Sequence, residues 1–287
     1  MRSKLFVPCT RPEFFAKALA GDADAISFDL EDSVPEDAKA QARAQLRDFL
    51  SSDAARESGP DKRVIVRVNA FDTAHFMDDL AAISGLRVDL LNLPKAERAE
   101  DVRAAAAAIE AATPRDASAR PMGLLLNIET PRALACAAEI ARAHPTVAGL
   151  QVGLNDLFEP LDIDRADLSH VHAALWTIRL ASAQAGCFAY DGAYADLADE
   201  DGFRREAELS RSLGFLGKSC IHPKQVAIAN AVFDRGGVEL ASARRIVEAA
   251  RNAAAAGKGA FLLDGRMIDR PAIAHAEAVL AKWVGSR

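Results

Sequence analysis

The feature that most constrains the fold of this sequence is a repeated unit. In each unit, a short apolar run ends in polar or charged residues and is followed by an alanine-rich helical stretch. Eight runs can be placed about 25–35 residues apart, the length of one strand plus one helix. They are Lys4–Pro8, Ala25–Asp32, Arg63–Asn69, Asp89–Lys95, Gly123–Glu129, Gly149–Asp156, Cys187–Asp191 and Gly217–His222. This alternation predicts parallel strands joined by helices.

Eight units favour a closed (β/α)8 TIM barrel over an open doubly wound sheet. No G-x-G-x-x-G motif follows any of the runs, whereas a dinucleotide-binding sheet would carry one. Some runs are continuously apolar, such as Leu124–Leu126, which is typical of strands covered by helices. Helices are predicted over Ala99–Ala112, Pro131–Ala143 and Leu168–Ala185. We therefore predict an α/β barrel over residues 1–225.

Residues 226–287 exceed what an eight-unit barrel needs. They contain a short predicted strand, Phe261–Leu263, then an Asp264-Gly265 turn and a last helix after Pro271. We predict a mostly helical C-terminal extension that packs on the barrel or on a neighbouring subunit.

Composition narrows the class of protein. Half of the residues are hydrophobic and the formal net charge is −6, which argues against a nucleic-acid or anionic-membrane partner. No uncharged apolar stretch reaches the roughly 18 residues of a membrane span. The four cysteines are scattered without a C-x-x-C pair, which indicates reduced thiols in a cytoplasmic enzyme.

Ionisable and amide side chains end nearly every run. Because the active sites of such barrels lie at the C-terminal ends of the strands, these residues predict where the chemistry sits. They are Asp29, Glu31, Asp32, Arg67, Asn69, Lys95, Glu129, Asn155, Asp156, Asp191, Lys218 and His222.

Glu129 and Asp156 end consecutive runs, and neighbouring strands lie roughly 4.8 Å apart. Two carboxylates without a nearby Cys or His suit Mg²⁺, which is held by one or two carboxylates plus water. A general acid/base pair with divergent pKa values is the alternative. Arg67 is suited to bind a substrate carboxylate in a bidentate fork, or to form a structural ion pair with Glu31 or Asp32.

Two histidines and a tryptophan are not expected to carry chemistry. His170 and His172 are two residues apart in a helical stretch, so they point to different faces and do not predict a metal pair. Trp176 is expected in the core.

Several short motifs, taken in order, resemble a known family. They are Leu5-Phe6-Val7-Pro8, Phe28-Asp29-Leu30-Glu31-Asp32-Ser33-Val34, Val66-Arg67-Val68-Asn69, Ile128-Glu129-Thr130, Gly153-Leu154-Asn155-Asp156-Leu157, Ile221-His222-Pro223 and Gly265–Pro271. Together they resemble the citrate lyase β-subunit-like branch of the HpcH/HpaI aldolase superfamily. The similarity runs nearly end to end.

The resemblance implies a Mg²⁺-dependent carbon–carbon lyase. The substrate would be a malyl-, citramalyl- or citryl-like β-hydroxyacyl thioester, bound to CoA or to a carrier protein, and the products a keto acid and an acyl thioester. Glu129 and Asp156 would hold the metal, and Arg67 would bind the acid portion. Asp269 would handle a proton in the active site of a neighbouring subunit of a homotrimer, and Asp32, beside Arg67, is a further catalytic candidate. The residues implied to line the thioester or its carrier are Phe6, Pro8, Lys39, Ile221 and His222.

Two other functions remain open at this stage. One is a metal-dependent aldolase acting on free hydroxy-keto acids, and the other is a subunit that works only in a complex or has no catalytic activity. The sequence also departs from the family at Cys9, where relatives usually have glycine after the first-strand proline. We expect the Cys9 side chain to narrow the approach of the thioester.

Overall fold

The computed structural model describes residues 1–56, 62–113, 122–234, 236–255, 257 and 259–284. The chain divides into two compact units, Met1–Phe233 and Asp234–Arg287. The first unit ends with helix α11 (Pro223–Phe233), whereas the boundary expected from the sequence lies inside this helix.

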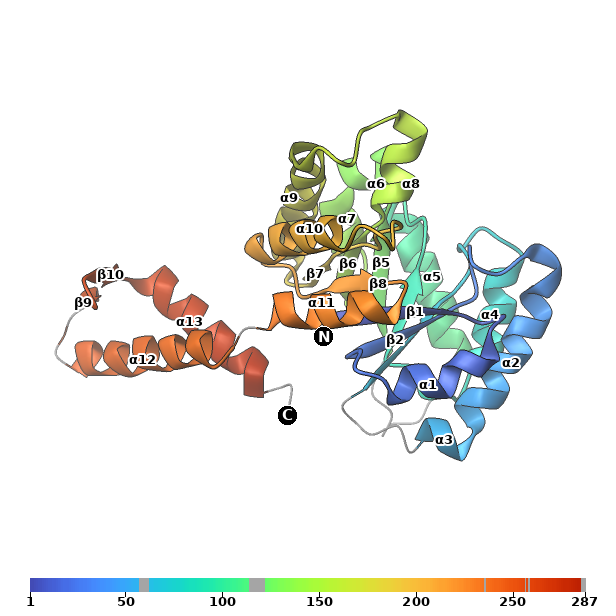
Figure 1. Cartoon of the computed structure of the whole chain (residues 1–287), viewed down its shortest axis with the longest axis horizontal. Helices are drawn as coiled ribbons and strands as arrows, with labels where there is room; N and C mark the ends of the chain where they lie inside the picture. Colours follow the sequence, from blue (N-terminus) through green and yellow to red (C-terminus); the bar gives the residue numbers. More distant parts are fainter. Residues whose placement is uncertain (57–61, 114–121, 235, 256, 258, 285–287) are drawn as a thin grey trace. The chain divides into compact units, whose positions relative to one another are not determined.

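The first unit is built on eight parallel strands (Figure 1). They follow the order β7-β6-β5-β4-β3-β2-β1-β8. The ring is completed where Asp191, directly after β7, forms a parallel bridge to Lys218 in β8, and its backbone N–H donates to Gly217 O at 2.9 Å. The predicted (β/α)8 TIM barrel is confirmed. The strands are β1 (Ser3–Pro8), β2 (Ala25–Asp29), β3 (Arg63–Arg67), β4 (Leu90–Leu93), β5 (Gly123–Ile128), β6 (Val147–Val152), β7 (Phe188–Tyr190) and β8 (Lys218–Cys220).

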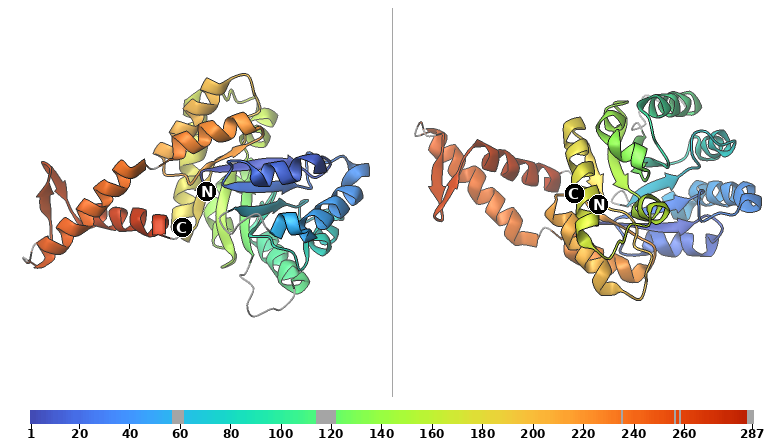
Figure 2. Two further views of the ribbon diagram at one scale, coloured as in Figure 1. Left: turned by 60° about the horizontal axis from the view of Figure 1, so that its bottom comes forward. Right: turned by 90° about the horizontal axis from the view of Figure 1, so that it is seen from above.

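Helices surround these strands (Figure 2). The predicted bounds of α5 and α9 are confirmed, whereas the helix predicted over Pro131–Ala143 is divided into α6 and α7 because Cys136 leaves helical geometry at ψ 9°. No helix among the described residues is long and apolar enough to cross a membrane. The helices before α11 are α1 (Phe15–Ala20), α2 (Lys39–Ser51), α3 (Asp53–Arg56), α4 (His75–Ile83), α5 (Ala99–Ala112), α6 (Pro131–Ala135), α7 (Ala137–Ala141), α8 (Leu154–Phe158), α9 (Leu168–Ala185) and α10 (Glu200–Ser212).

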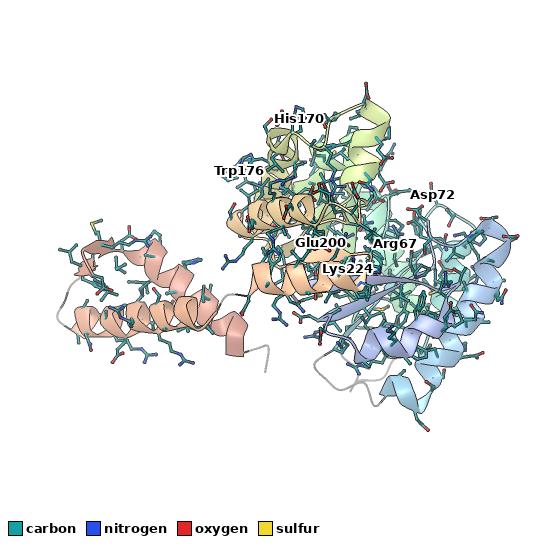
Figure 3. All side chains as sticks on the ribbon, viewed as in Figure 1. Arg67, Asp72, His170, Trp176, Glu200 and Lys224 are labelled. Atoms are coloured by element: carbon teal, nitrogen blue, oxygen red, sulfur yellow. The ribbon has the colours of Figure 1, made fainter. Side chains whose placement is uncertain are left out.

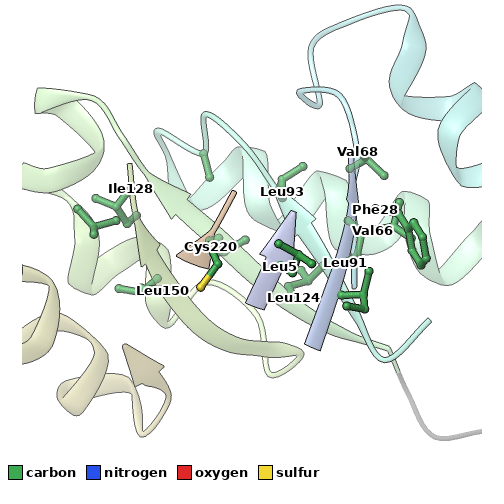
Figure 4. Close-up of a cluster of buried hydrophobic side chains, with 14 of the residues drawn as sticks. Leu5, Phe28, Val66, Val68, Leu91, Leu93, Leu124, Ile128, Leu150 and Cys220 are labelled. Atoms are coloured by element: carbon green, nitrogen blue, oxygen red, sulfur yellow. The ribbon is translucent and has the colours of Figure 1, made fainter. Parts of the chain in front are cut away.

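Successive side chains along each strand point alternately toward the surrounding helices and into the barrel, so the protein has two buried regions. One set of side chains, including Leu5, Phe28, Val66 and Leu124, forms a continuous apolar cluster between the sheet and the helices (Figure 4). Each fully buried side chain of this kind stabilises the fold by about 1.5–3 kcal/mol. The intervening residues turn into the barrel, and many of them are polar: Lys4, Ser27, Asn92, Asn127, Gln151 and Ser219.

Trp176 does not belong to the core, so that expectation is wrong. The buried residues of α9 include Val171, Leu175 and Ile178, which follow helical spacing along one face. Trp176 falls on the other face, is 49% exposed and stacks on His172 (Figure 3).

The second unit consists of two helices and a hairpin. These are α12 (Gly236–Ala255), β9 (Phe261–Leu263), β10 (Arg266–Ile268) and α13 (Arg270–Val284). The predicted strand and turn are present, and Asp264 and Gly265 both have positive φ, as a tight two-residue hairpin turn requires. Ala243, Ala276 and Val279 form a small core of this unit.

Candidate active site

Arg67 ends β3 and is held by Asp29, which ends β2. Its Nε and Nη2 donate to the two carboxylate oxygens of Asp29, both at 2.7 Å, in a bidentate pair. The Phe6 ring centroid lies 5.0 Å from the guanidinium carbon. Burial acts to raise the pKa of Asp29, but the charge of Arg67 and the hydrogen bonds that Asp29 accepts together outweigh it and hold this pKa below its ordinary value. The main partner of Arg67 is therefore neither of the two acidic residues that the sequence suggested.

The remaining nitrogen of Arg67, Nη1, faces those two residues. It lies 2.8 Å from Glu31 Oε2 and 3.4 Å from Asp32 Oδ2. Lys95 Nζ approaches Glu31 Oε1 at 3.1 Å from the other side. Burial raises the pKa of Glu31 to about 7, against the opposing charge of Arg67. Arg67, Asp32, Glu31 and Lys95 therefore form one ionic group at the strand ends, where Figure 3 labels Arg67.

Glu129 directly follows β5 and is only 3% exposed. Its Oε1 accepts from the Lys95 backbone N–H at 2.7 Å, and its Oε2 accepts from Asn127 Nδ2 at 3.0 Å. A Cβ on Gly153 would lie 2.5 Å from Glu129 Cβ, so the end of β6 approaches this residue closely only because glycine is present there. Burial, and then the charge of Asp156, raise the pKa of Glu129.

Asp156 lies in the first turn of α8, which begins directly after Gly153. Its pKa is raised, first by loss of hydration and then by the negative charge of Asp32. Arg67 and Lys95 oppose this shift. Each of these carboxylates therefore makes ionisation of another less favourable.

Carboxylates outnumber cations in this part of the barrel. Arg67 and Lys95 face five acidic residues, Asp29, Glu31, Asp32, Glu129 and Asp156. Two further lysines lie near them without closing the gap: Lys39 bonds to backbone carbonyls, and burial lowers the pKa of Lys4. Such a surplus is costly away from water, and a divalent cation would offset it. No group of three or more His, Cys, Asp or Glu residues converges on one point in the described parts of the chain. Two hard oxygen ligands with water in the remaining positions match Mg²⁺, so Glu129 and Asp156 fit this ion.

The residues implied to line the thioester are distributed over one neighbourhood. β1 pairs with β8, with Leu5 opposite Cys220, so Phe6 and Pro8 end beside Ile221 and His222. Ile221 is 40% exposed. His222 Nδ1 accepts from the Lys224 backbone N–H at 3.2 Å.

Lys39 is committed to the backbone. Its Nζ donates to the carbonyl oxygens of Leu30 and Glu31 at 3.0 and 3.1 Å, which fixes the loop after β2. It also lines a cavity of about 300 Å³, together with Asp32, Asn69 and Lys95.

Two further sequence candidates, Cys9 and Asp269, have different surroundings. Cys9 is fully buried in the apolar cluster between sheet and helices, so the expectation that it narrows the site is wrong. Asp269 belongs to the second unit, where its Oδ1 accepts from the Ala272 backbone N–H at 3.3 Å at the start of α13. Its role in a neighbouring subunit remains a prediction.

A second ionic cluster joins β8 to α10. Lys218 is fully buried, and its Nζ donates to Asp191 at 2.9 Å and to Glu206 at 2.6 Å. Arg165 adds bonds to both oxygens of Glu206, at 3.0 and 2.7 Å, and contacts Asn155. Two cations match two carboxylates, so this cluster needs no further ion.

The sequence interpretation missed polar residues inside the barrel that contact the charged residues at the strand ends, here called the rim. Asn127 holds Glu129, and behind it lie Asn92 and Lys4. Side chains on a strand alternate between its two faces, so a residue two positions before a rim residue also points into the barrel. This alternation could have identified Asn127 from the sequence.

The sequence and the fold are similar to those of known proteins. Residues 2–223 match the HpcH/HpaI aldolase/citrate lyase family. A (3S)-malyl-CoA thioesterase of Cereibacter sphaeroides is 38% identical over 283 residues, covering 98% of this chain and 94% of that protein. An L-malyl-CoA/beta-methylmalyl-CoA lyase of the same species is 33% identical over 301 residues, covering 97% of this chain and 93% of that protein. The structure of CitE from Mycobacterium tuberculosis in complex with magnesium, acetoacetate and coenzyme A superposes with a TM-score of 0.74 and 34% identity over 98% of both chains. The chain therefore belongs to the HpcH/HpaI aldolase/citrate lyase family.

Proposed function

We propose that this protein is a Mg²⁺-dependent carbon–carbon lyase. It cleaves a malyl-, citramalyl- or citryl-like β-hydroxyacyl-CoA thioester into a keto acid and an acyl-CoA. The observation that carries the proposal is the surplus of carboxylates around Arg67 at the strand ends. The lyase and the CoA-bound CitE among the similar proteins support the substrate class.

The residues at the strand ends have different proposed roles. Glu129 and Asp156 would hold Mg²⁺, which would supply Lewis acidity toward the oxygens of the substrate. Asp29 fixes two nitrogens of Arg67, so the acid portion would meet Nη1, where it replaces or shares the contact with Glu31 at 2.8 Å. There its positive charge stabilises the negative charge that develops on oxygen during cleavage. Asp32 lies 3.4 Å from Nη1 and helps to orient it.

The thioester would follow the edge between β1 and β8. Phe6, Pro8, Ile221 and His222 would line it there. Lys39 lines the 300 Å³ cavity and fixes the loop after β2 through its backbone contacts. Cys9 offers no obstruction, since its side chain is buried on the opposite side of the sheet.

Thioester hydrolysis is the second candidate function. It is favoured by one observation, the 38% identity to a protein named (3S)-malyl-CoA thioesterase. Both reactions start from the same kind of substrate but break different bonds. The lyase breaks a carbon–carbon bond and leaves the thioester intact, whereas the hydrolase breaks the carbon–sulfur bond and releases free CoA thiol.

One assay distinguishes the two candidates. Purified protein with Mg²⁺ is incubated with malyl-CoA, citramalyl-CoA or citryl-CoA, and the keto acid and the free thiol are measured in parallel. Keto acid without thiol supports the lyase, and thiol without keto acid replaces it with the hydrolase. Neither product from any substrate contradicts both candidates. Cleavage of free hydroxy-keto acids without CoA would instead support an aldolase, and activity only with a partner protein would indicate a complex subunit.

We further propose a cytoplasmic homotrimer in which Asp269 from one subunit donates a proton in the site of its neighbour. The four cysteines are all free, which supports a reducing compartment. Leu262 and Met267, on the hairpin beside Asp269, are 74% and 66% exposed, which suits a covered surface. Mixing the inactive variants Arg67→Ala and Asp269→Asn tests this arrangement. Mixed trimers regain activity if Asp269 acts between subunits, and stay inactive if it acts within its own.

A further inference from the structure

A chain of polar side chains crosses the interior of the barrel and ends on Glu129. Lys4 Nζ lies 3.5 Å from Asn92 Oδ1, and Asn92 Nδ2 donates to Asn127 Oδ1 at 2.8 Å. Asn127 Nδ2 then donates to Glu129 Oε2 at 3.0 Å. Each of these four residues is at most 3% exposed. The chain thus links β1, β4 and β5 to the proposed metal site without access to water.

The hydrogen bonds of this chain have one direction. The Lys4 amine is a donor, so Asn92 turns its oxygen toward it and its NH₂ group toward Asn127 and the Leu125 carbonyl, the latter at 3.0 Å. Asn127 therefore presents oxygen to Asn92 and NH₂ to Glu129. Turning either amide around would place oxygen against oxygen, or NH₂ against a donor, in a dry interior where such mismatches cost about 1–3 kcal/mol.

Lys4 sets this direction whether or not it is charged. Its other contacts are Gln151, to which Nζ donates, and the Phe6 ring, whose centroid lies 4.2 Å away. Burial, and then the charge of Arg67, lower the pKa of Lys4 well below its ordinary value. Both the ammonium and the neutral amine have N–H groups to donate, and the Leu125 carbonyl holds the NH₂ group of Asn92 on the other side, so the orientation of Asn92 is the same in either state.

We propose that Lys4 is a positioning residue for the metal site: through Asn92 and Asn127, it fixes the orientation in which Glu129 presents its carboxylate. This inference rests on the proposed role of Glu129 as a Mg²⁺ ligand. Asn127 fixes one oxygen of Glu129 and the Lys95 N–H fixes the other, and each oxygen keeps a lone pair for a cation. Groups that orient metal ligands in this way typically change metal affinity by about 10–100-fold.

The test measures binding of Mn²⁺ alone, a paramagnetic ion that accepts the same oxygen ligands as Mg²⁺. Free Mn²⁺ is followed by electron paramagnetic resonance in titrations of the full chain. Lys4→Met and Asn127→Leu are each expected to raise the Kd about tenfold. The double variant is expected to bind no more weakly than Asn127→Leu, because Lys4 acts only through Asn127. An unchanged Kd in Lys4→Met, or effects that multiply in the double variant, would overturn the inference.

Two further variants test whether a general loss of packing, rather than loss of the Lys4 contact, raises the Kd for Mn²⁺. Ser27→Ala removes another buried polar group of the barrel and is expected to leave the Kd unchanged; a loss equal to that of Lys4→Met would contradict the inference. If Lys4→Met does not fold, Asn92→Ala interrupts the same chain and is expected to raise the Kd equally. Wild-type protein that binds no Mn²⁺ refutes the metal site itself, whereas a binding wild type with unaffected variants refutes only the role of Lys4.

Discussion

The barrel contains two ionic clusters that differ in charge balance and in access to water. The closing cluster consists of Lys218, Arg165, Asp191 and Glu206; the rim cluster consists of Arg67, Lys95, Asp29, Glu31, Asp32, Glu129 and Asp156. The closing cluster pairs two cations with two carboxylates, and Lys218 and Asp191 are fully buried. The rim cluster has five carboxylates for two cations, and its Lys95 and Asp32 side chains are about half exposed, at 49% and 52%. A balanced, sealed cluster serves stability, whereas an unbalanced, open one is suited to bind a cation.

The pKa shifts follow this division in part, since Asp29 of the rim cluster has a lowered pKa and Asp191 of the closing cluster a raised one. Burial opposes the charge of Glu206, but Lys218 and Arg165 outweigh it and lower its pKa. Asp191 keeps a raised pKa because it is completely buried, although Lys218 opposes the shift. In the rim cluster, no neighbouring cation outweighs burial at Glu31, Glu129 or Asp156, and all three pKa values are raised. These are the groups that a divalent cation would stabilise in charged form.

The largest effect that separates the clusters is expected from Glu129→Gln. Loss of this ligand should lower lyase activity at least about 1000-fold, because several kcal/mol of Lewis-acid stabilisation disappear. Stability in EDTA should change little, since the removal of a buried, repelled charge offsets the cost of setting the new NH₂ group against one of the two donors of Glu129. Initial rates and urea unfolding check the two parts. Glu110→Gln, which changes an exposed carboxylate on α5, is the control and should keep full activity. Retained activity in Glu129→Gln would exclude the proposed metal site.

The next effect is expected in the closing cluster, and on stability. Lys218→Met leaves Asp191 and Glu206 without their shared cation, so the free energy of unfolding should fall by about 3–5 kcal/mol. Urea unfolding measures it. Arg63→Met breaks a more exposed pair, with Asp89 at 3.2 Å, and should cost less than about 1 kcal/mol. Equal losses in the two variants would remove the distinction between a sealed cluster and a surface pair.

A smaller effect concerns pH. The pKa of Glu31 is about 7 in the folded protein and 4.5 ordinarily, so between these values the folded state keeps a proton that the unfolded state has lost. The contribution of Glu31 to stability is therefore complete below pH 4.5 and declines as pH rises to about 7. Glu31→Gln abolishes this decline, so its stability relative to wild type should improve by up to about 3 kcal/mol across that range. Urea unfolding in EDTA at a series of pH values tests it, and parallel profiles would contradict it.

Local sequence pattern predicted the barrel and the rim, but not which rim residues pair. The eight runs and their charged ends follow from chemistry that repeats along the chain, and Glu129 and Asp156 could be found there. The pairing of Arg67 with Asp29 depends on the register between β2 and β3, which places these two residues opposite each other. Register is set by the closure of the whole barrel, so a single strand does not reveal it.

The polar side chains inside the barrel were not predicted from the sequence for a related reason. Leu124–Leu126 suggested a strand that is apolar on both faces, whereas Asn127 shares the inward face with Leu125 and meets Asn92 from β4. Trp176 was misplaced because α9 is apolar on more than its buried face, so composition alone did not identify the side that packs. In each case, the missing information was a contact with another element.

The smallest predicted effect examines the backbone of the rim cluster. Among the described non-glycine residues with positive φ, Lys95, Asp162 and Asp264, only Lys95 belongs to either cluster. Its left-handed conformation, at φ 52°, directs its N–H to Glu129 Oε1 at 2.7 Å and costs a side-chain-bearing residue about 1 kcal/mol. The free energy of unfolding of Lys95→Gly should therefore be about 1 kcal/mol higher than that of Lys95→Ala. Both variants lose the ion pair with Glu31, so their difference in urea isolates the backbone term. If alanine is as stable as glycine, the rim holds Glu129 without strain, and backbone conformation adds nothing to the difference between the two clusters.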